Sequence, residues 1–590
     1  MIDSMIKKYA NLLTALCIVA AAYAAPYLVP GDPDALVFRD GIFPAILLLV
    51  TAYPVSAALK KHALRDLIYG CAFALVFAFF LGLGGELMFY EGLLPGMGSL
   101  IRRFAVPCMV TPLLGVLCSY VFAHPYRLSG ASGRQLPYLF YFLVLAMSYT
   151  ATFLAFFPGI VNYDFQGEIV QYMTGEYLAS HPIFHTVLLG ALYQLGTALF
   201  GSATGGAAVY SVFQQLLLSA MFAWCLRFIQ KRVPLWATLL LTAAMALLPF
   251  HGVLAISTIK DALFTGLCAM LCMTLWEIAE DPAAFITSLK IKLRFFLISL
   301  LMSLLRHNAV FAVIPAIIAI VALCRRARLK AVVACAVTLL FCFCMPRFLQ
   351  FATNATDILS SELMSVPCQQ LMRTAATADD LTQKERSEIS AWFSDAIHRY
   401  RPTCADPAKG GNFDLVRYSE HPEEYWSMYL KYAKRYPRIY IEAFFFNCMG
   451  IWYPDDTTHA HTLDGEDWDY VYLRTGNNVP EMVGEVTSHS YLPAYRDLLR
   501  DSTHHSSHED VPLYAQLFKP STYVYLLLLL TMLLLHRREG RLALCTLPVW
   551  GIIISLFFSA CILVRYAYPA MTCVPMLLLL IVFSGKRAAA

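Results

Sequence analysis

The stretch from Pro158 to His185 reads PGIVNYDFQGEIVQYMTGEYLASHPIFH, follows an uninterrupted apolar segment and contains no Lys or Arg. It places carboxylates and imidazoles where a membrane helix would meet water, at Asp164, Glu168, Glu176, His181 and His185. A carboxylate at that depth is costly unless it has a function or a partner. We therefore interpret the rest of the chain as a scaffold that holds this loop at one face of a membrane.

The composition of the whole chain favours a polytopic helical membrane protein. Of its 590 residues, 59% are hydrophobic and 14% are charged, whereas soluble domains carry about 25% charged residues. The mean hydropathy is +0.59. The chain has no basic stripe with interleaved aromatic residues, so we expect a lipid bilayer as a partner and no nucleic acid.

Apolar runs long enough to span a bilayer predict about 14 membrane helices. The runs lie at about 9–29, 42–59, 64–84, 104–123, 137–157, 206–229, 234–250, 259–280, 292–306, 308–324, 330–346, 521–536, 541–564 and 567–584. One further run, 183–200, fits either a span or a helix along the surface. We interpret the first run as a retained helix and not as a signal peptide, because it is long enough to span and no clear cleavage site is present.

The loop charges decide between the two interpretations of residues 183–200. Cytoplasmic loops are enriched in Lys and Arg. With the N-terminus inside and 183–200 not crossing, most basic clusters fall inside, including those at 60–65, 290–294 and 325–330. The sequence therefore predicts a multi-pass protein of the plasma (inner) membrane with both termini in the cytoplasm. Arg102 and Arg103 are exceptions, because they fall outside.

This topology divides the chain into four regions. They are four N-terminal membrane helices at 1–136, a membrane core at 137–346 with an outer loop at 158–205, an extracytoplasmic domain of mixed, mainly helical character at 347–519, and C-terminal membrane helices at 520–590. Most of the 17 Cys lie in apolar runs, such as Cys268 and Cys272, where they act as small hydrophobes. A disulfide between Cys368 and Cys404 is an open alternative in an extracytoplasmic domain.

Asp164 is the main candidate for chemistry. It lies seven residues after the apolar run ends at Phe157, and Pro158 and Gly159 break the helix. Glu168 follows at i+4, close to Asp164 on one helix face. Two interpretations are open for Asp164. It is a general base or metal ligand for a substrate at the membrane surface, or it is the N-cap of a short helix.

Two histidines follow in the order His181-Pro182-x-x-His185. At this spacing they could bind a metal ion, hydrogen-bond a phosphate, or pack at the interface, and no third metal ligand is evident. The outer domain is also rich in His, where a solvated loop is favoured over a metal site. These histidines are His459, His461, His489, His504, His505 and His508.

Three cations lie at the outer ends of predicted spans, against the positive-inside bias. They are Lys260, followed by Asp261; Arg306, followed by His307 and Asn308; and Arg565, followed by Tyr566. Each alone could be a snorkelling side chain. Together, facing an acidic loop, they predict a common anionic ligand such as a lipid phosphate or diphosphate. The chain has no GxxxxGK[ST] motif, so we expect a lipid-linked donor and not a nucleotide sugar.

These features resemble the GT-C superfamily of membrane glycosyltransferases, which includes protein O-mannosyltransferases, aminoarabinose transferases and oligosaccharyltransferases. The resemblance is carried by an outward Asp after a membrane helix, a short helix, His-Pro at 181–182, LFG at 199–201 and a span that ends in basic residues. It covers about residues 137–584 and leaves out the first four spans, which look like an N-terminal addition. The chain departs from the family pattern at Phe165, where a second acid is common, and at Ile183, where a second proline is common.

The resemblance implies an inverting GT-C enzyme that moves a hexosyl or pentosyl group from a polyprenyl-phosphate donor to a glycan, lipid or protein acceptor of the cell envelope. Asp164 would be the catalytic base and Asp261 a second acid, and the donor phosphate would be held by Lys260, Arg306 and Arg565. The supporting candidates are Glu168, His181, His185, Asn308 and Tyr566. The cofactor stays open, with a divalent metal ion as one option, and the active site would be extracytoplasmic.

Two other functions draw on the same features. A flippase or transporter for a lipid-linked glycan would need ionisable residues along a path in the middle of the spans, whereas the charges of this chain gather at the predicted outer face. A polymerase or ligase of surface polysaccharide would use a similar donor and differ mainly in the length of the glycan.

Overall fold

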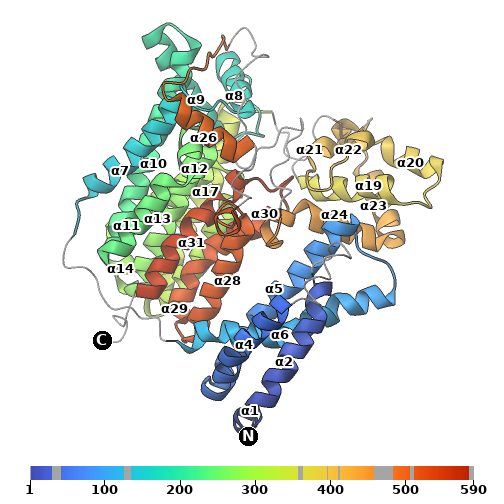
Figure 1. Cartoon of the computed structure of the whole chain (residues 1–590). Coiled ribbons are helices and arrows are strands. Elements are labelled where there is room, and N and C mark those ends of the chain that lie inside the picture. Colours follow the sequence, from blue (N-terminus) through green and yellow to red (C-terminus); the bar gives the residue numbers. More distant parts are fainter. Residues whose placement is uncertain are drawn as a thin grey trace. The chain divides into compact units, whose positions relative to one another are not determined.

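The computed structural model describes residues 2–28, 42–124, 135–356, 363–394, 396–409, 412–456, 483–504 and 511–583. Every regular element in these ranges is a helix, and the extended segments form only isolated β-bridges (Figure 1). The prediction of a helical protein is confirmed for this part of the chain, and the region predicted to be mixed and mainly helical also forms only helices where it is described. The backbone divides into two compact units, one of residues 1–126, 365–458 and 524–540, the other of residues 127–364, 459–523 and 541–590.

The first unit combines N-terminal apolar helices with the helices of the polar region. Its α-helices are α1 (Ile2–Lys8), α2 (Ala10–Ala24), α4 (Ile42–Lys61), α5 (Leu64–Tyr90), α6 (Met97–Ala123), α19 (Ser365–Thr377), α20 (Gln383–Ser390), α21 (Asp406–Lys409), α22 (Leu415–Glu420), α23 (Pro422–Arg435), α24 (Pro437–Asn447), α25 (Met449–Trp452) and most of α28 (Pro520–His536).

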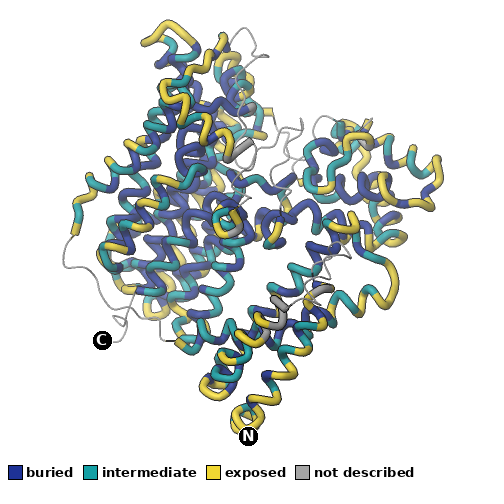
Figure 2. The backbone as a smooth tube through the Cα atoms, in the orientation of Figure 1, coloured by how far each residue is buried: buried dark blue, intermediate teal, exposed yellow. Residues whose placement is uncertain are grey.

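The second unit contains every candidate site residue named above. Its α-helices are α7 (Tyr138–Ala155), α8 (Tyr163–Thr174), α9 (Ile183–Phe200), α10 (Ala203–Gln230), α11 (Leu235–Leu247), α12 (Pro249–Ile256), α13 (Lys260–Glu280), α14 (Pro282–Thr287), α15 (Leu289–Leu305), α16 (Val310–Leu323), α17 (Arg328–Ala352), α26 (Pro493–His504), α27 (Pro512–Ala515), most of α29 (Gly540–Ala543), α30 (Leu547–Leu556) and α31 (Val564–Phe583). Nearly all of α13 is buried, and Figure 2 shows buried residues concentrated in the helices around it.

The long apolar helices are those of a multi-pass membrane protein. Among the described residues, eight helices are long and apolar enough to cross a membrane, or up to ten if the bent pairs α1–α2 and α11–α12 each form one span. Helix α9 is one of the eight by length and composition, so the prediction that 183–200 does not cross still rests on the loop charges. The count of about 14 spans also stays a prediction.

Two span predictions are corrected by the helix boundaries. The run at 541–564 is not one helix, because α30 ends at Leu556 and the next helix, α31, begins at Val564. The run at 234–250 reaches the short helix α12, which is bent by 57° from α11. Hydropathy averages over a window, so it detects neither the end of α30 nor the bend after Leu247.

A buried ion pair joins the polar helices of the first unit to the loop between α5 and α6. Arg373 Nε and Nη2 donate to Glu442 Oε2 at 3.0 and 2.9 Å, and Leu93 N donates to Glu442 Oε1 at 3.0 Å. On either side of this loop, Arg103 Nε of α6 donates to Glu86 Oε2 of α5 at 2.7 Å. The charge of Arg103, an exception to the positive-inside pattern, is therefore balanced by a carboxylate.

Replacing Arg373 tests this ion pair. Arg373→Met leaves the Glu442 carboxylate buried without its main partner, which should lower the free energy of unfolding by about 3 kcal/mol. Thermal unfolding of the purified chain in detergent, followed by circular dichroism, measures the change. Lys431→Met is the control, because Lys431 pairs with Glu388 where both side chains are more than 40% exposed, and it should change stability by less than about 1 kcal/mol. Equal shifts for the two variants would contradict the assignment.

Candidate active site

Two short backbone segments pair just before the site residues begin. Ile160 N donates to Ile256 O at 3.1 Å, and Thr258 N donates to Ile160 O at 2.9 Å, which makes a parallel bridge. The first residue of α8 is Tyr163 and the first residue of α13 is Lys260. Because the bridge fixes the register of the two segments, the starts of α8 and α13 lie side by side.

The N-cap of α8 is Asn162, so the interpretation of Asp164 as an N-cap is wrong. Asn162 Oδ1 accepts from Asp164 N at 3.2 Å, and Asn162 N donates to Thr258 Oγ1 at 3.1 Å. The Asp164 side chain is therefore not needed to terminate the helix. It lies in the first turn, where the helix dipole favours a negative charge.

The Asp164 carboxylate faces two cations from two other helices. Asp164 Oδ2 lies 3.7 Å from Lys260 Nζ at the start of α13 and 3.8 Å from Arg565 Nη1 at the start of α31. The Asp164 and Lys260 side chains are each 15% exposed, and that of Arg565 is 4% exposed. The starts of three helices thus bring the predicted base and two of the predicted phosphate ligands together at a site with little exposure to solvent.

The third predicted cation, Arg306, is paired with the second predicted acid. Arg306 Nη1 donates to Asp261 Oδ1, and the Asp261 side chain is buried. The ring of Tyr566 connects this pair to the first group, because its centroid lies 5.1 Å from the Arg306 guanidinium carbon and 4.9 Å from that of Arg565. Such cation–π contacts hold a guanidinium group in place.

Glu168, the supporting acid, is buried and holds both histidines. His185 Nδ1 lies 2.6 Å from Glu168 Oε2, and His181 Nδ1 lies 3.8 Å from Glu168 Oε1. Lys260 Nζ lies 3.9 Å from Glu168 Oε1 and 3.1 Å from His181 Nδ1. The three supporting candidates of the opening loop, Glu168, His181 and His185, therefore lie next to Lys260 or next to a residue that contacts it.

The surroundings set the charge of each group outside the spans. Burial opposes ionisation of Asp164, but the charges of Lys260 and Arg565 outweigh it and lower the pKa of Asp164 to about 2. Burial also opposes ionisation of Glu168, and the neighbouring His185 overcomes it and lowers the pKa of Glu168. Burial and the charge of Lys260 lower the pKa of His181, so a neutral His181 accepts a hydrogen bond from Lys260.

Asn308 lies outside this group of contacts. Its Nδ2 donates to Ser555 Oγ of α30 at 3.4 Å.

The alternative of a metal ion between His181 and His185 lacks support, because no group of three or more metal ligands among the described residues includes either histidine. Of the histidines in the predicted outer domain, four lie outside the described residues, namely His459, His461, His505 and His508.

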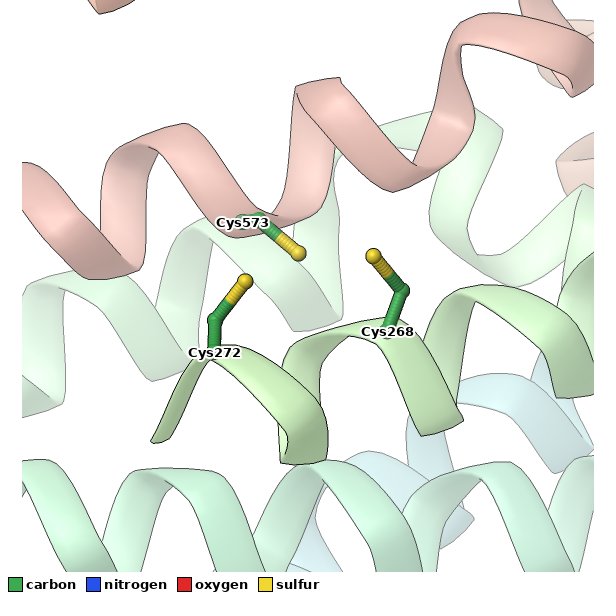
Figure 3. Close-up of side chains that lie close together, drawn as sticks. All are labelled: Cys268, Cys272 and Cys573. Atoms are coloured by element: carbon green, nitrogen blue, oxygen red, sulfur yellow. The ribbon is translucent and has the colours of Figure 1, made fainter. Parts of the chain in front are cut away.

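A cluster of three thiols lies deeper in the second unit. Cys268 and Cys272 of α13 and Cys573 of α31 point toward one another (Figure 3), with sulfur atoms within 4.8 Å of each other. By distance they could hold a soft metal ion, yet they are fully buried among apolar side chains, as expected for Cys in apolar runs. In the polar helices of the first unit, Cys368 and Cys404 are both free thiols, so they do not form the disulfide that the sequence left open.

Two residues that complete the site are absent from the sequence-based prediction. Tyr210 OH lies 2.7 Å from His185 Nε2 and donates to Gln214 Oε1 at 2.9 Å. Both lie inside the apolar helix α10, four residues apart. The signal was available, because a buried amide inside a predicted span is costly unless it is hydrogen-bonded and marks a site worth inspecting.

The chain belongs to DUF6020, a family of unknown function, whose model matches residues 172–590. The matched stretch contains His181, His185, Lys260, Asp261, Arg306 and Arg565, and it begins after Asp164 and Glu168. No curated protein and no solved structure matches the chain.

The backbone pairing can be tested at Gly159. This glycine has a φ of +113°, and an added Cβ would overlap Ser211 Oγ and lie 2.9 Å from Ile256 O, the carbonyl that accepts from Ile160 N. Gly159→Ala should therefore lower the free energy of unfolding by about 2 kcal/mol or more. Thermal unfolding in detergent measures it.

Gly167→Ala is the matched control for Gly159→Ala. Gly167 lies inside α8, and an added Cβ there meets no atom within 4 Å. This substitution should raise stability by about 0.5 to 1 kcal/mol, because it removes the conformational freedom of a helical glycine. Tolerance of alanine at both positions would show that the pairing of 160 with 256–258 does not need Gly159.

Proposed function

We propose that the chain is an inverting glycosyltransferase of the GT-C type, which moves a sugar from a polyprenyl-phosphate donor to an acceptor of the cell envelope. One observation carries the proposal: a buried carboxylate, Asp164, faces Lys260 and Arg565 at 3.7 and 3.8 Å where three helices end. A base beside two cations is the arrangement that a sugar transfer with a phosphate leaving group requires.

In the proposed reaction, the acceptor hydroxyl loses its proton to Asp164 as its oxygen attacks the anomeric carbon. The bond from that carbon to the phosphate oxygen breaks, and the electron pair leaves with the phosphate. Lys260 and Arg565 stabilise the charge that develops on this oxygen. Asp261 and Tyr566 hold the Arg306 guanidinium nearby, where it serves as the third phosphate contact.

The low pKa of Asp164 implies an order of events. With a pKa of about 2, the carboxylate is too weak a base to take a proton from a hydroxyl efficiently. A bound donor phosphate would compensate Lys260 and Arg565, the two charges that lower this pKa, and so raise it. The donor would therefore activate the base, and an acceptor that arrives without the donor would meet an inactive one.

The location of the site follows from the loop charges. We propose a protein of the plasma (inner) membrane with about 14 spans, both termini in the cytoplasm, and the site at the extracytoplasmic face. In this topology the donor would enter from the outer leaflet. A flippase is less well supported, because the ionisable side chains that the site uses lie at helix ends and not along one span.

Substitution of Asp164 tests the proposal directly. Asp164→Asn and Asp164→Ala should reduce sugar transfer by at least about a hundredfold, because the general base is lost. Cells that lack the chain should accumulate one polyprenyl-phosphate sugar and lack one sugar in an envelope glycan, and mass spectrometry of both pools measures whether each variant restores the wild-type pattern.

Glu176→Gln is the control for the Asp164 variants. Glu176 is exposed in the same loop, and its loss should leave transfer unchanged. Protein levels in the membrane must match for all variants. Restoration of the envelope glycan by Asp164→Ala would overturn the proposed function.

The pH dependence of transfer tests the role of Lys260. In the wild type before the donor binds, Asp164 has a pKa of about 2, so lowering the pH to about 5 should not change kcat/KM for the donor through this group. Lys260→Met removes the larger of the charges that depress this pKa, so the pKa rises and the base becomes protonated as the pH falls. The ratio of kcat/KM at about pH 5 to kcat/KM at about pH 7.5 should therefore fall in Lys260→Met and stay near the wild-type ratio in Lys260→Arg. Identical ratios for Met and Arg would contradict the electrostatic role.

A further inference from the structure

A chain of hydrogen bonds leads from the candidate site into the helix core. It begins at Glu168 and passes through His185, Tyr210 and Gln214 to the backbone carbonyls at 254–257. Every side chain in it is almost fully buried. Because buried donors and acceptors must be matched, each link restricts where the protons of the next link lie.

The carbonyl end of the chain fixes the orientation of Gln214. Its Nε2 donates to Ala255 O at 3.0 Å and to Leu254 O at 3.3 Å, and it also donates to Ser257 O. Carbonyl oxygens only accept hydrogen bonds. The amide nitrogen must therefore face them, and the amide oxygen must face Tyr210.

The orientation of Gln214 fixes the proton of Tyr210. Gln214 Oε1 accepts from Tyr210 OH at 2.9 Å, which uses the single proton of that hydroxyl. Tyr210 then accepts from His185 Nε2, 2.7 Å away. His185 Nε2 must therefore carry a proton.

The other nitrogen of His185 carries a proton as well. Glu168 Oε2 lies 2.6 Å from His185 Nδ1 and also accepts from Thr186 Oγ1 at 3.1 Å. Lys260 Nζ lies 3.9 Å from Glu168 Oε1, and the neighbouring positive charges lower the pKa of Glu168 despite its burial, so Glu168 is an ionised carboxylate. A carboxylate oxygen only accepts hydrogen bonds, so Nδ1 is the donor of the short bond. His185 is thus an imidazolium, and its pair with Glu168 has no net charge.

We propose that Tyr210 and Gln214 are positioning residues that keep the proton on His185, so that Glu168 stays compensated and Lys260 stays available to an anionic substrate. This inference rests on the proposed function. Lys260 Nζ lies 3.7 Å from Asp164 and 3.9 Å from Glu168. A Glu168 carboxylate without a cationic His185 would compete with the substrate phosphate for this ammonium group.

The charged and titratable groups around this pair come from five elements. They are Asp164 and Glu168 on α8, His181 before α9, Tyr210 on α10, Lys260 and Asp261 on α13, and Arg565 on α31. Asp261 is compensated by Arg306. Because the charges of Glu168 and His185 cancel, the group formed by Asp164, Lys260 and Arg565 has a net charge of +1. This charge suits a phosphodiester monoanion.

The chain offers a matched set of variants for the test. Gln214→Met has a similar length but no acceptor for Tyr210, so Tyr210 can donate to His185 Nε2 and make His185 neutral. Gln214→Glu, with its carboxyl group protonated, keeps an oxygen that accepts from Tyr210 and an O–H that donates to the backbone carbonyls. Gln215→Met is the control, because Gln215 is buried next to Gln214 in the same helix and has an Oε1 without a hydrogen-bond partner among the described residues.

The protonation state of His185 can be measured without any substrate. Full-length protein with ¹⁵N-labelled histidine is reconstituted in lipid bilayers at about pH 8, well above the usual pKa of histidine. The His185 signals in solid-state NMR are those lost in His185→Gln, or those altered in Gln214→Met and not in Gln215→Met. Two protonated nitrogens are expected in the wild type and in Gln214→Glu, and one in Gln214→Met. A neutral His185 in the wild type would overturn the proposal.

Sugar transfer tests the consequence for the site. At about pH 8, Gln214→Met should reduce transfer by about tenfold or more, since an uncompensated charge about 4 Å from Lys260 is worth at least that factor. The loss should be smaller at about pH 6, where the solvent supplies the proton, and Gln214→Glu and Gln215→Met should match the wild type. A role in packing alone predicts the same loss at both pH values, which would overturn the positioning role.

The two arms separate this inference from the proposed function. If Asp164→Asn keeps transfer while NMR shows a cationic His185, the proposed function fails and the proton assignment stands. If Asp164→Asn abolishes transfer while Gln214→Met is fully active at about pH 8, the proposed function stands and the positioning role is wrong.

Discussion

The arrangement of the candidate site depends on one pair of backbone hydrogen bonds, between Ile160 and the segment 256–258. The two residues that matter most lie just beyond it, Asp164 in the helix after one segment and Lys260 in the helix after the other. Neither helix start could be displaced along its axis without breaking these bonds. Gly159 makes the approach possible, because a side chain there would meet the carbonyl of Ile256.

Charge balance explains why so many ionisable groups tolerate burial in one place. Each acid has a partner: Asp164 with Lys260 and Arg565, Asp261 with Arg306, and Glu168 with His185. A buried charge without a partner would cost several kcal/mol. Of these three groups, the one around Asp164 holds more cations than acids, so it is the place in the site where an anionic ligand would gain most.

Asp164, Lys260 and Arg565, which the structure brings together, could be singled out in the sequence because each lies beside an apolar run. A carboxylate after the helix break at 158–159 and cations at the starts of two spans must lie near the membrane surface. The pairing was harder to predict, since Arg306 meets Asp261 and Asn308 faces Ser555 through tertiary contacts with no local signal. The helix N-cap also went to Asn162, because two residues of that stretch cap well and only the backbone path chooses between them. The predicted span boundaries were wrong where a bend or a break between two helices interrupts an apolar run, as at 248–249 and 557–563.

The short helix α12 links the backbone pairing at Ile160 to the charges of the site. It ends at Ile256, and the last carbonyls of any helix have no partner within the helix. Gln214 donates to those of Leu254 and Ala255, and the same contact orients its oxygen toward Tyr210. The protonation state proposed for His185 thus depends on the carbonyls at the end of α12, a helix that begins after a bend of 57° from α11. The end of a short helix inside an apolar run would in this way influence the charge beside Lys260.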